Sequence, residues 1–304
     1  MRIALIGQAA FGEKVLRALC EKGEQVVVAY MPPDSPGGKG NPLREAAETL
    51  GVPVRQPARM RDPEVFEDYR TFTPDLNVMA FVTDIVPRTI LDYPTHGTIQ
   101  YHPSLLPRHR GASAINWAVI NGETKTGLTI FWPDEGLDTG PILLQKEVTI
   151  EPDDTVGTVY FNKLFDLGVE TLLESVQLVK EGLAPKIAQD LTQGEYEPIC
   201  RRMVIDWMYP VGVVYNVIRG CNPSPGAITT CQGQEIKIFD CERRARSGPE
   251  DPGTVLEVQA DGFLVAGCGG SLFVKRVQPK GAGKMPAAEF AASVGLKAGD
   301  RLGG

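Results

Sequence analysis

Short apolar runs alternate with helical patterns through the first half of the chain. Runs with strand character lie at residues 2–6, 25–30, 76–81, 97–101, 126–132 and 142–150. The first run ends at Gly7, and apolar residues at helical spacing follow Gly12. Strands that alternate with helices predict a mainly parallel sheet with right-handed crossovers and helices on its faces. The pattern therefore predicts a Rossmann-like α/β architecture.

A long helical pattern closes this half of the chain. Asp153 or Asp154 is expected to cap a helix that runs to about Glu181. Its apolar positions recur at helical spacing, at Tyr160, Leu164, Leu167, Leu172 and Val176. Beyond Gly182 the chain becomes polar and loses clear periodicity, which is typical of a linker.

The C-terminal third has a different pattern of hydrophobic and polar residues. A short helix is expected at residues 206–219, followed by short strands at 235–239, 253–258, 262–266 and 271–277. Short strands separated by turn residues favour a small β-barrel of the OB type. The predicted organisation is an α/β domain over residues 1–182, a linker over 183–203 and a small barrel domain over 204–304.

Composition limits the classes of partner. The chain has 304 residues, of which 42% are hydrophobic and 23% charged, and its formal net charge is −7. This balance provides material for a core but no global basic surface for nucleic acid, although Arg108, His109 and Arg110 form a local basic run. No apolar run approaches the roughly 20 residues that span a bilayer, so no membrane partner is expected.

Metal and nucleotide sites find little support. None of the six Cys forms a Cys-x-x-Cys pair, and no His follows His109, so no metal is expected. Gly7 and Gly12 do not form the G-x-G-x-x-G fingerprint of dinucleotide binding. Free thiols and the absence of a leader-like segment predict a cytoplasmic location.

The strongest chemical signal is an imidazole followed by a carboxylate. His102, one of only three His, ends a strand-like run, and Pro103 holds its backbone extended. Asp138 lies in the turn Gly136-Leu137-Asp138-Thr139-Gly140 between two later runs. Such a pair transfers protons and stabilises an oxyanion at a carbonyl under attack. His96 and His109 are interpreted as structural, and Ser104 lacks the G-x-S-x-G elbow of a nucleophile.

The run from His102 to Gly111, with Asn116-Trp117, Thr126-Gly127 and Gly136 to Gly140, resembles the formyltransferases that use 10-formyltetrahydrofolate. Within this superfamily, Tyr101 to Trp117 is most similar to the N-terminal hydrolase domain of 10-formyltetrahydrofolate dehydrogenase. The C-terminal segments, among them Pro223-Ser224-Pro225-Gly226-Ala227, resemble the barrel domain of methionyl-tRNA formyltransferase.

The resemblance implies roles for particular residues. His102 would stabilise the oxyanion, and Asp138 would tune His102, move protons and contact the folate. Gln100 stands where most of the superfamily has Asn, and would assist at the formyl oxygen from one methylene further out. The segment Phe81 to Val86 would line the pterin pocket, with backbone contacts at Asp84, Ile85 and Val86.

These implications predict an enzyme that transfers the formyl group of 10-formyltetrahydrofolate to an amine or to water, without a metal. Methionyl-tRNA formyltransferase is the first alternative; the acidic balance argues against tRNA. A formyltransferase acting on a nucleotide-linked amino sugar is the second, and a folate-binding protein whose catalysis decayed through Gln100 is the third. The sequence leaves open the acceptor, the oligomeric state and whether a separate dehydrogenase chain acts with this protein.

Overall fold

The computed structural model describes residues 1–34, 37, 40–245 and 248–303. Contacts among them group into two compact units. One comprises residues 1–112, 127–148 and 161–197, and the other residues 113–126, 149–160 and 198–304. These groupings follow contacts in space, so the division at residues 182 and 203, which follows the order of the chain, remains a prediction.

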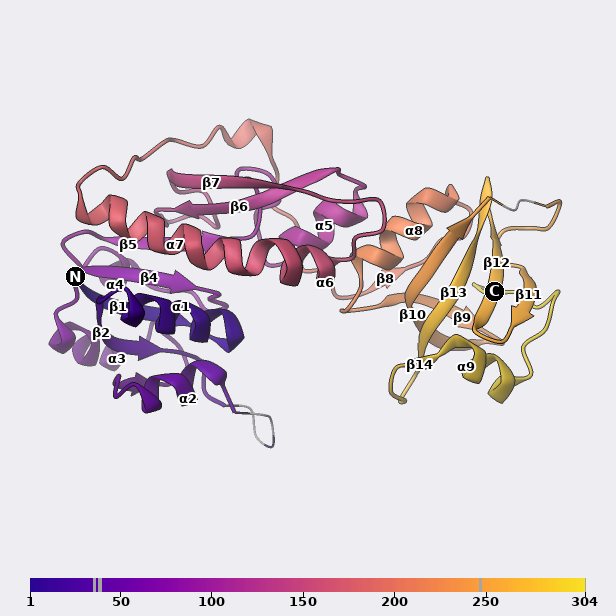
Figure 1. The fold of residues 1–304 in the computed structure, drawn as a ribbon, viewed down its shortest axis with the longest axis horizontal. Helices are drawn as coiled ribbons and strands as arrows, with labels where there is room; N and C mark the ends of the chain where they lie inside the picture. The colour runs from indigo at the N-terminus through magenta and orange to yellow at the C-terminus, as the bar shows by residue number, and fades with distance from the viewer. Residues whose placement is uncertain (35–36, 38–39, 246–247, 304) are drawn as a thin grey trace. The chain divides into compact units, whose positions relative to one another are not determined.

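The first unit is built on one mixed sheet (Figure 1), with strand order β3-β2-β1-β4-β5-β6-β7. The pairs β2–β3, β1–β2, β1–β4 and β4–β5 are parallel, whereas β5–β6 is antiparallel. The strands are β1 (Arg2–Gly7), β2 (Gln25–Tyr30), β3 (Val54–Arg55), β4 (Leu76–Ala80), β5 (Thr98–His102), β6 (Lys125–Phe131) and β7 (Ile142–Thr149). This sheet confirms the predicted α/β class with a mainly parallel sheet; the antiparallel pairing of β6 and the short β3 were not predicted.

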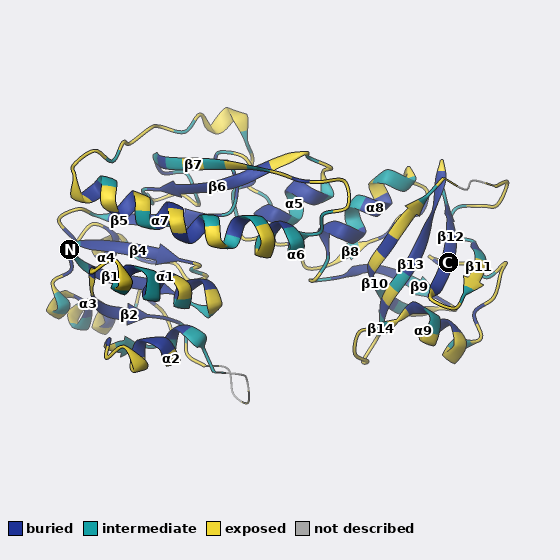
Figure 2. Cartoon of the chain, in the orientation of Figure 1, coloured by how far each residue is buried: buried dark blue, intermediate teal, exposed yellow. Residues whose placement is uncertain are grey.

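Both faces of the central strands are covered. Strand β1 is buried almost along its whole length (Figure 2), so it reads as a continuous apolar run rather than an alternating one. Ala4 and Ile6 belong to a core cluster with Val65 and Tyr69 of helix α3 (Pro63–Tyr69) and with the short helix α4 (Arg88–Leu91). Helix α1 (Ala9–Glu21) packs against α2 (Pro42–Thr49) and α7 (Phe165–Lys180).

The predicted helix from Asp153 or Asp154 to Glu181 is wrong in its first turns. Thr155 is the N-cap, and a short α6 (Val156–Val159) passes through a π-helical turn at Tyr160–Leu164 into α7. The Asp154 carboxylate instead accepts hydrogen bonds from the Glu151 backbone N–H and the Thr158 hydroxyl. Asp154 therefore stabilises the turn before the helix.

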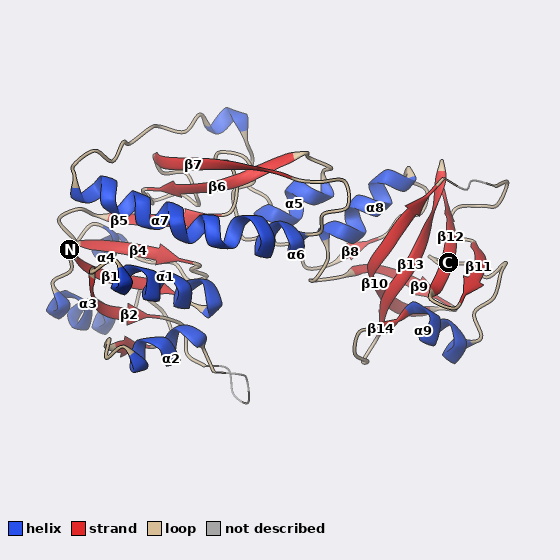
Figure 3. Cartoon of the chain, in the orientation of Figure 1, coloured by secondary structure: helices blue, strands red, loops and turns tan. Residues whose placement is uncertain are grey.

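The second unit contains a mostly antiparallel sheet (Figure 3), ordered β11-β12-β13-β10-β9-β8, with β14 beside β13. Its strands are β8 (Met203–Val204), β9 (Ala227–Cys231), β10 (Gln234–Arg244), β11 (Val255–Gln259), β12 (Gly262–Gly267), β13 (Gly270–Pro279) and β14 (Met285–Pro286). Bridges from Leu302 to Cys231 and from Arg301 to Thr254 connect strands near the two edges. The C-terminal sheet domain is thus confirmed, although β8, β9 and β14 were not predicted.

Helices α5 (Ala114–Ile120), α8 (Val211–Gly220) and α9 (Ala287–Val294) belong to the second unit, where α5 packs against α8. The helix predicted at 206–219 begins later, at Val211, because Pro210 precedes its first turn. Asp206 forms a local turn in which its carboxylate accepts the Met208 backbone N–H.

No helix in the described ranges is long and apolar enough to cross a membrane. All six cysteines are free, and four of them are buried.

Candidate active site

His102 is the last residue of β5 and is buried at the carboxyl edge of the first sheet. Its ring Nε2 lies 2.9 Å from the backbone carbonyl oxygen of His109. Because a carbonyl oxygen only accepts, Nε2 carries a proton and donates it in this hydrogen bond. The backbone of His109 therefore determines which ring nitrogen is protonated when the imidazole is neutral.

The second ring nitrogen of His102 faces Asp138. Nδ1 lies 3.6 Å from Asp138 Oδ2, and the side chains of His102 and Asp138 are only 7% and 14% exposed. A neutral ring presents its Nδ1 lone pair on this side, whereas a protonated ring presents an N–H to the carboxylate. This arrangement accepts a proton and stabilises the resulting cation, as an acid–base pair requires.

Asp138 is held by main-chain contacts in the turn between β6 and β7. Its backbone is left-handed, with φ of 56°, and its Oδ2 accepts the Gly111 N–H at 2.9 Å. The Gln189 amide donates to the carbonyls of Asp138 and Gly140, at 3.0 and 2.6 Å. A side chain at Gly140 would collide with the Trp132 carbonyl. The glycine permits the close turn that places Asp138.

Hydrogen bonds also fix the loop that follows His102. The Ser104 hydroxyl donates to the Arg108 carbonyl at 2.7 Å. The Thr129 hydroxyl donates to the Ser104 carbonyl at 2.6 Å and accepts the Leu106 N–H at 3.1 Å. The Gln145 amide donates to the Leu106 carbonyl at 2.8 Å. Ser104 therefore serves the loop as a structural hydroxyl.

Gln100 lies two residues before His102 on β5, so their side chains share a face of the strand. It pairs with Met79 of β4 and Phe131 of β6 through the backbone. The side chain is partly exposed, and its amide makes no hydrogen bond to another described residue. The amide is therefore available to a bound molecule.

The segment predicted to line a pterin pocket follows β4. Phe81, in left-handed backbone with φ of 62°, is 47% exposed, and Ile85 is 65% exposed, whereas Val86 is buried. Asp84 organises this loop, because its carboxylate accepts the backbone N–H groups of Met60 at 2.6 Å and Ile85 at 2.8 Å. The segment thus exposes apolar side chains. Its one carboxylate, Asp84, is already hydrogen-bonded to two backbone N–H groups.

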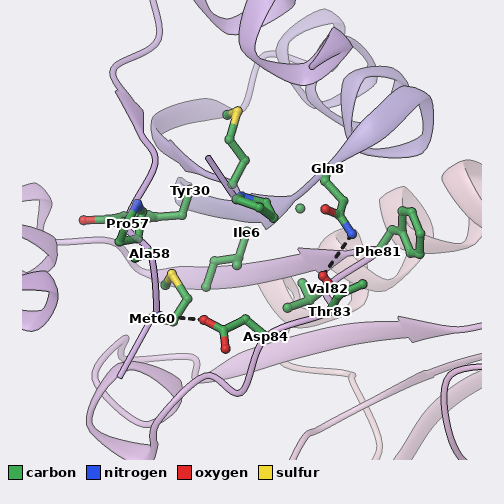
Figure 4. A pocket seen from close by; sticks show the side chains of 13 residues that line it. Ile6, Gln8, Tyr30, Pro57, Ala58, Met60, Phe81, Val82, Thr83 and Asp84 are labelled. Atoms are coloured by element: carbon green, nitrogen blue, oxygen red, sulfur yellow. Dashed lines mark hydrogen bonds between the residues drawn. The ribbon is translucent and has the colours of Figure 1, made fainter. Parts of the chain in front are cut away.

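A cavity of about 230 Å³ lies at the carboxyl ends of β1, β2 and β4 (Figure 4). Its walls are mostly apolar and include two of the predicted folate residues, Phe81 and Asp84. The other lining residues are Ile6, Gly7, Gln8, Tyr30, Met31, Pro32, Pro57, Ala58, Met60, Val82 and Thr83. None of these described lining residues is Lys, Arg or His, so the lining offers no cationic side chain to an anion.

Two polar side chains at this cavity are engaged with neighbours. The Gln8 amide donates to the Thr83 hydroxyl at 3.2 Å, as Figure 4 shows. Burial, together with a hydrogen bond to Asp68, raises the pKa of Tyr30 far above its usual range, so its phenol stays protonated. His102, Asp138 and Gln100 do not line this cavity, but β4 and β5 are parallel neighbours, so both features lie at the same sheet edge.

The structure brings His102 and Asp138 together and places Gln100 on the same strand as His102. The carbonyl of His109 and the N–H of Gly111, which hold the pair, were missed by sequence reasoning because every residue type carries these main-chain groups. The one signal of these contacts in the sequence was Gly111, which follows the basic run of residues 108–110. Within the described ranges, no group of three or more His, Cys, Asp or Glu side chains is arranged to hold a metal ion.

Comparison with known proteins agrees with this architecture. An N-formyltransferase from Helicobacter canadensis, solved with folinic acid and dTDP-3-aminofucose, superposes with a TM-score of 0.69 at 16% identity. The match covers 91% of this chain and 98% of that protein. At this identity the likeness establishes the fold alone.

Sequence comparison identifies the family. The formyl transferase model matches residues 1–176, and the formyl transferase C-terminal domain model matches residues 201–295. The chain therefore belongs to the formyl transferase family. Membership confirms the family predicted from the central motif, and with it an enzyme of folate-dependent one-carbon chemistry.

Two named relatives differ in how much of their length is matched. Methionyl-tRNA formyltransferase from Geobacter sulfurreducens is 38% identical over 311 residues, which cover all of this chain and 97% of that protein. Cytosolic 10-formyltetrahydrofolate dehydrogenase from Xenopus laevis is 40% identical over 307 residues, or 95% of this chain. The chain spans about a third, 34%, of the dehydrogenase's length.

Proposed function

We propose that this protein binds 10-formyltetrahydrofolate and transfers its formyl group to an amine or to water. The observation that carries the proposal is the buried His102–Asp138 pair, with the uncommitted Gln100 amide on the same strand. The exposed apolar side chains of the segment after β4 provide a surface for the pterin at the same edge of the sheet. The folate serves as the carrier of the transferred group.

The role of each residue follows from the charges that develop during formyl transfer. The acceptor attacks the formyl carbon, and the formyl oxygen becomes an oxyanion. Protonated His102, through the Nδ1–H that makes no close hydrogen bond to Asp138, and the Gln100 amide donate hydrogen bonds to that oxygen, which lowers the barrier. Asp138 receives the proton that the acceptor loses and passes it to the folate N10, which leaves when the tetrahedral intermediate collapses. The bond to the acceptor forms first, and the bond to N10 breaks as the carbonyl double bond re-forms.

The relatives and the structural neighbour leave three candidate acceptors in view. The dehydrogenase relatives are named for 10-formyltetrahydrofolate, and the resemblance of Tyr101 to Trp117 to a hydrolase domain supports water as the acceptor. The full-length match to methionyl-tRNA formyltransferase supports methionyl-tRNA as a second candidate acceptor. An amino sugar linked to a nucleotide is a third, because the Helicobacter protein was solved with one. We favour water or a small amine, since the net charge of −7 does not assist binding of tRNA.

The test is a comparison of acceptors under one set of conditions. Purified protein is incubated with 10-formyltetrahydrofolate alone, with methionyl-tRNA, with a dTDP-linked amino sugar and with a metabolite extract. Release of tetrahydrofolate is followed by absorbance, and formylated products are identified by mass spectrometry. His102→Ala serves as the matched inactive control. Folate binding without turnover in every mixture would instead support a folate-binding protein that has lost catalysis.

We further propose a cytoplasmic location. Its support is the set of free thiols, which a reducing compartment maintains. Fractionation of cells that express a tagged full-length chain would test it.

A further inference from the structure

Residues 195–197, distant in the sequence, pair with the loop that follows His102 through main-chain hydrogen bonds. The Arg110 N–H donates to the Glu195 carbonyl at 3.2 Å, and the Glu197 N–H donates to the Arg110 carbonyl at 3.0 Å. Gly111 lies so close that an added Cβ would stand 2.7 Å from the Glu197 carbonyl oxygen. Main-chain pairing of this kind brings the Glu197 side chain beside the loop.

Glu197 then contacts the ring of His109. The two side chains are 20% and 7% exposed, and Glu197 Oε2 lies 2.8 Å from His109 Nδ1. His109 has left-handed backbone, with φ of 53°, which is uncommon for a residue with a Cβ. A buried ring that is hydrogen-bonded to a carboxylate holds the residue in this conformation.

The backbone of the same loop holds both members of the proposed catalytic pair. The His109 carbonyl accepts the Nε2–H of His102, and the Gly111 N–H donates to Asp138. Any rotation of the His109 backbone therefore moves the acceptor that orients the His102 ring. Within the described part of the chain, this carbonyl is the group that holds His102 Nε2 in place.

We propose that Glu197 is a positioning residue for the formyl-transfer reaction. Its carboxylate fixes the ring of His109, and the His109 carbonyl in turn fixes the orientation and tautomer of His102. Glu197 does not touch the reacting atoms. This inference rests on the proposed function for its catalytic meaning, while the geometry it describes stands independently of turnover.

A positioning role affects kcat more than the KM for the folate, because His102 acts on the transition state while the folate is held elsewhere. Glu197→Ala is expected to lower kcat about tenfold, since small displacements of a catalytic group are costly. Glu197→Gln is expected to recover most of this loss, because its amide oxygen can accept the same ring N–H. KM should change less than about twofold in both variants.

Glu195→Ala is the matched control. Glu195 is exposed and contacts the loop through its main-chain carbonyl, so its substitution removes an equal charge nearby while keeping that contact. Its kcat should stay at the wild-type value. Equal kcat for Glu195→Ala and Glu197→Ala would overturn the proposal, as would failure of Glu197→Gln to recover activity in a folded protein.

A second readout does not depend on activity. The chain has only three His, so nitrogen-15 NMR of the imidazoles can be assigned by single substitutions. Wild-type His102 should show its proton on Nε2, and Glu197→Ala should mix its tautomers. Unchanged His102 signals in Glu197→Ala would overturn the positioning role. Absence of turnover in the wild-type protein, with the expected NMR change present, would remove the proposed function but keep the structural linkage.

Discussion

The loops that leave β4 and β5 start side by side at one edge of the sheet and are built in opposite ways. The loop after β5 is held by buried residues and hydrogen bonds: Ser104, Leu106 and His109 are all buried. The loop after β4 presents Phe81 and Ile85 to solvent. Its Asp84 carboxylate supplies two of its few hydrogen bonds.

The difference matches two different tasks. A group that must act on a transition state has to be held before the substrate arrives, because reorganisation during the reaction is costly. A surface that binds a flat, apolar ring system gains from exposed side chains that become buried on binding. We therefore propose that the loop after β5 carries the chemistry and that the loop after β4 recognises the substrate.

The largest effect on turnover is expected from substitution of His102 or Asp138. His102→Ala and Asp138→Ala should each lower kcat by about 100- to 1000-fold, the loss typical of an oxyanion-stabilising donor. Both variants should remain folded, and His102→Ala should still bind the folate, since the recognition loop is unchanged. Steady-state kinetics and calorimetry measure the two properties. Near-normal turnover in a folded variant would break the assignment of chemistry to this region.

The next largest effect concerns stability rather than rate. Thr129→Val removes a hydroxyl that bonds Ser104 and Leu106 and leaves two buried main-chain groups unsatisfied. The free energy of unfolding should fall by about 1–3 kcal/mol. Thr83→Val in the loop after β4 is the control, because that residue is exposed and should cost less than about 0.5 kcal/mol. Equal losses of unfolding free energy in the two variants, measured by denaturant unfolding, would show that the two loops are stabilised to the same extent.

A smaller effect should separate binding from catalysis. Ile85→Ala removes apolar surface that the folate would cover, so KM should rise about fivefold at constant kcat, from roughly 1 kcal/mol of lost burial. Because the side chain is 65% exposed, stability should not change. A fall in kcat with KM unaltered would contradict the division of tasks between the loops.

The smallest effect is expected at Gln100. Gln100→Asn should preserve or raise transfer to an amine, because the shorter amide restores the donor usual in the superfamily. The measurement is kcat/KM for consumption of 10-formyltetrahydrofolate, with and without amine acceptors. A loss greater than about tenfold, or roughly 1.4 kcal/mol of transition-state stabilisation, would instead mark Gln100 as adapted to the acceptor of this protein.

Sequence reasoning reached the elements whose signal is local. The apolar runs predicted the strands that carry the site, and Pro103 with the glycines around Asp138 predicted two turns. Contacts between distant segments were not predictable from one sequence. His109 was interpreted as structural because its partner, Glu197, lies 88 residues away. Strand β9 (Ala227–Cys231) was missed since its alternation is weak, and the π-helical turn before α7 has no pattern of its own.

The grouping of α5 with the C-terminal part of the chain has a practical consequence for building chimaeras. The chain enters this unit at Ser113, directly after the segment that holds Asp138. Within the unit, the Asn116 amide donates to the Gly220 carbonyl at 2.8 Å, and a side chain at Gly220 would collide with Ile120. A C-terminal domain exchanged at residue 203 would therefore carry a foreign α8 against a native α5. A functional exchange would have to transplant residues 113–126 and 149–160 with it, so the two domains are interchangeable only as interleaved pieces.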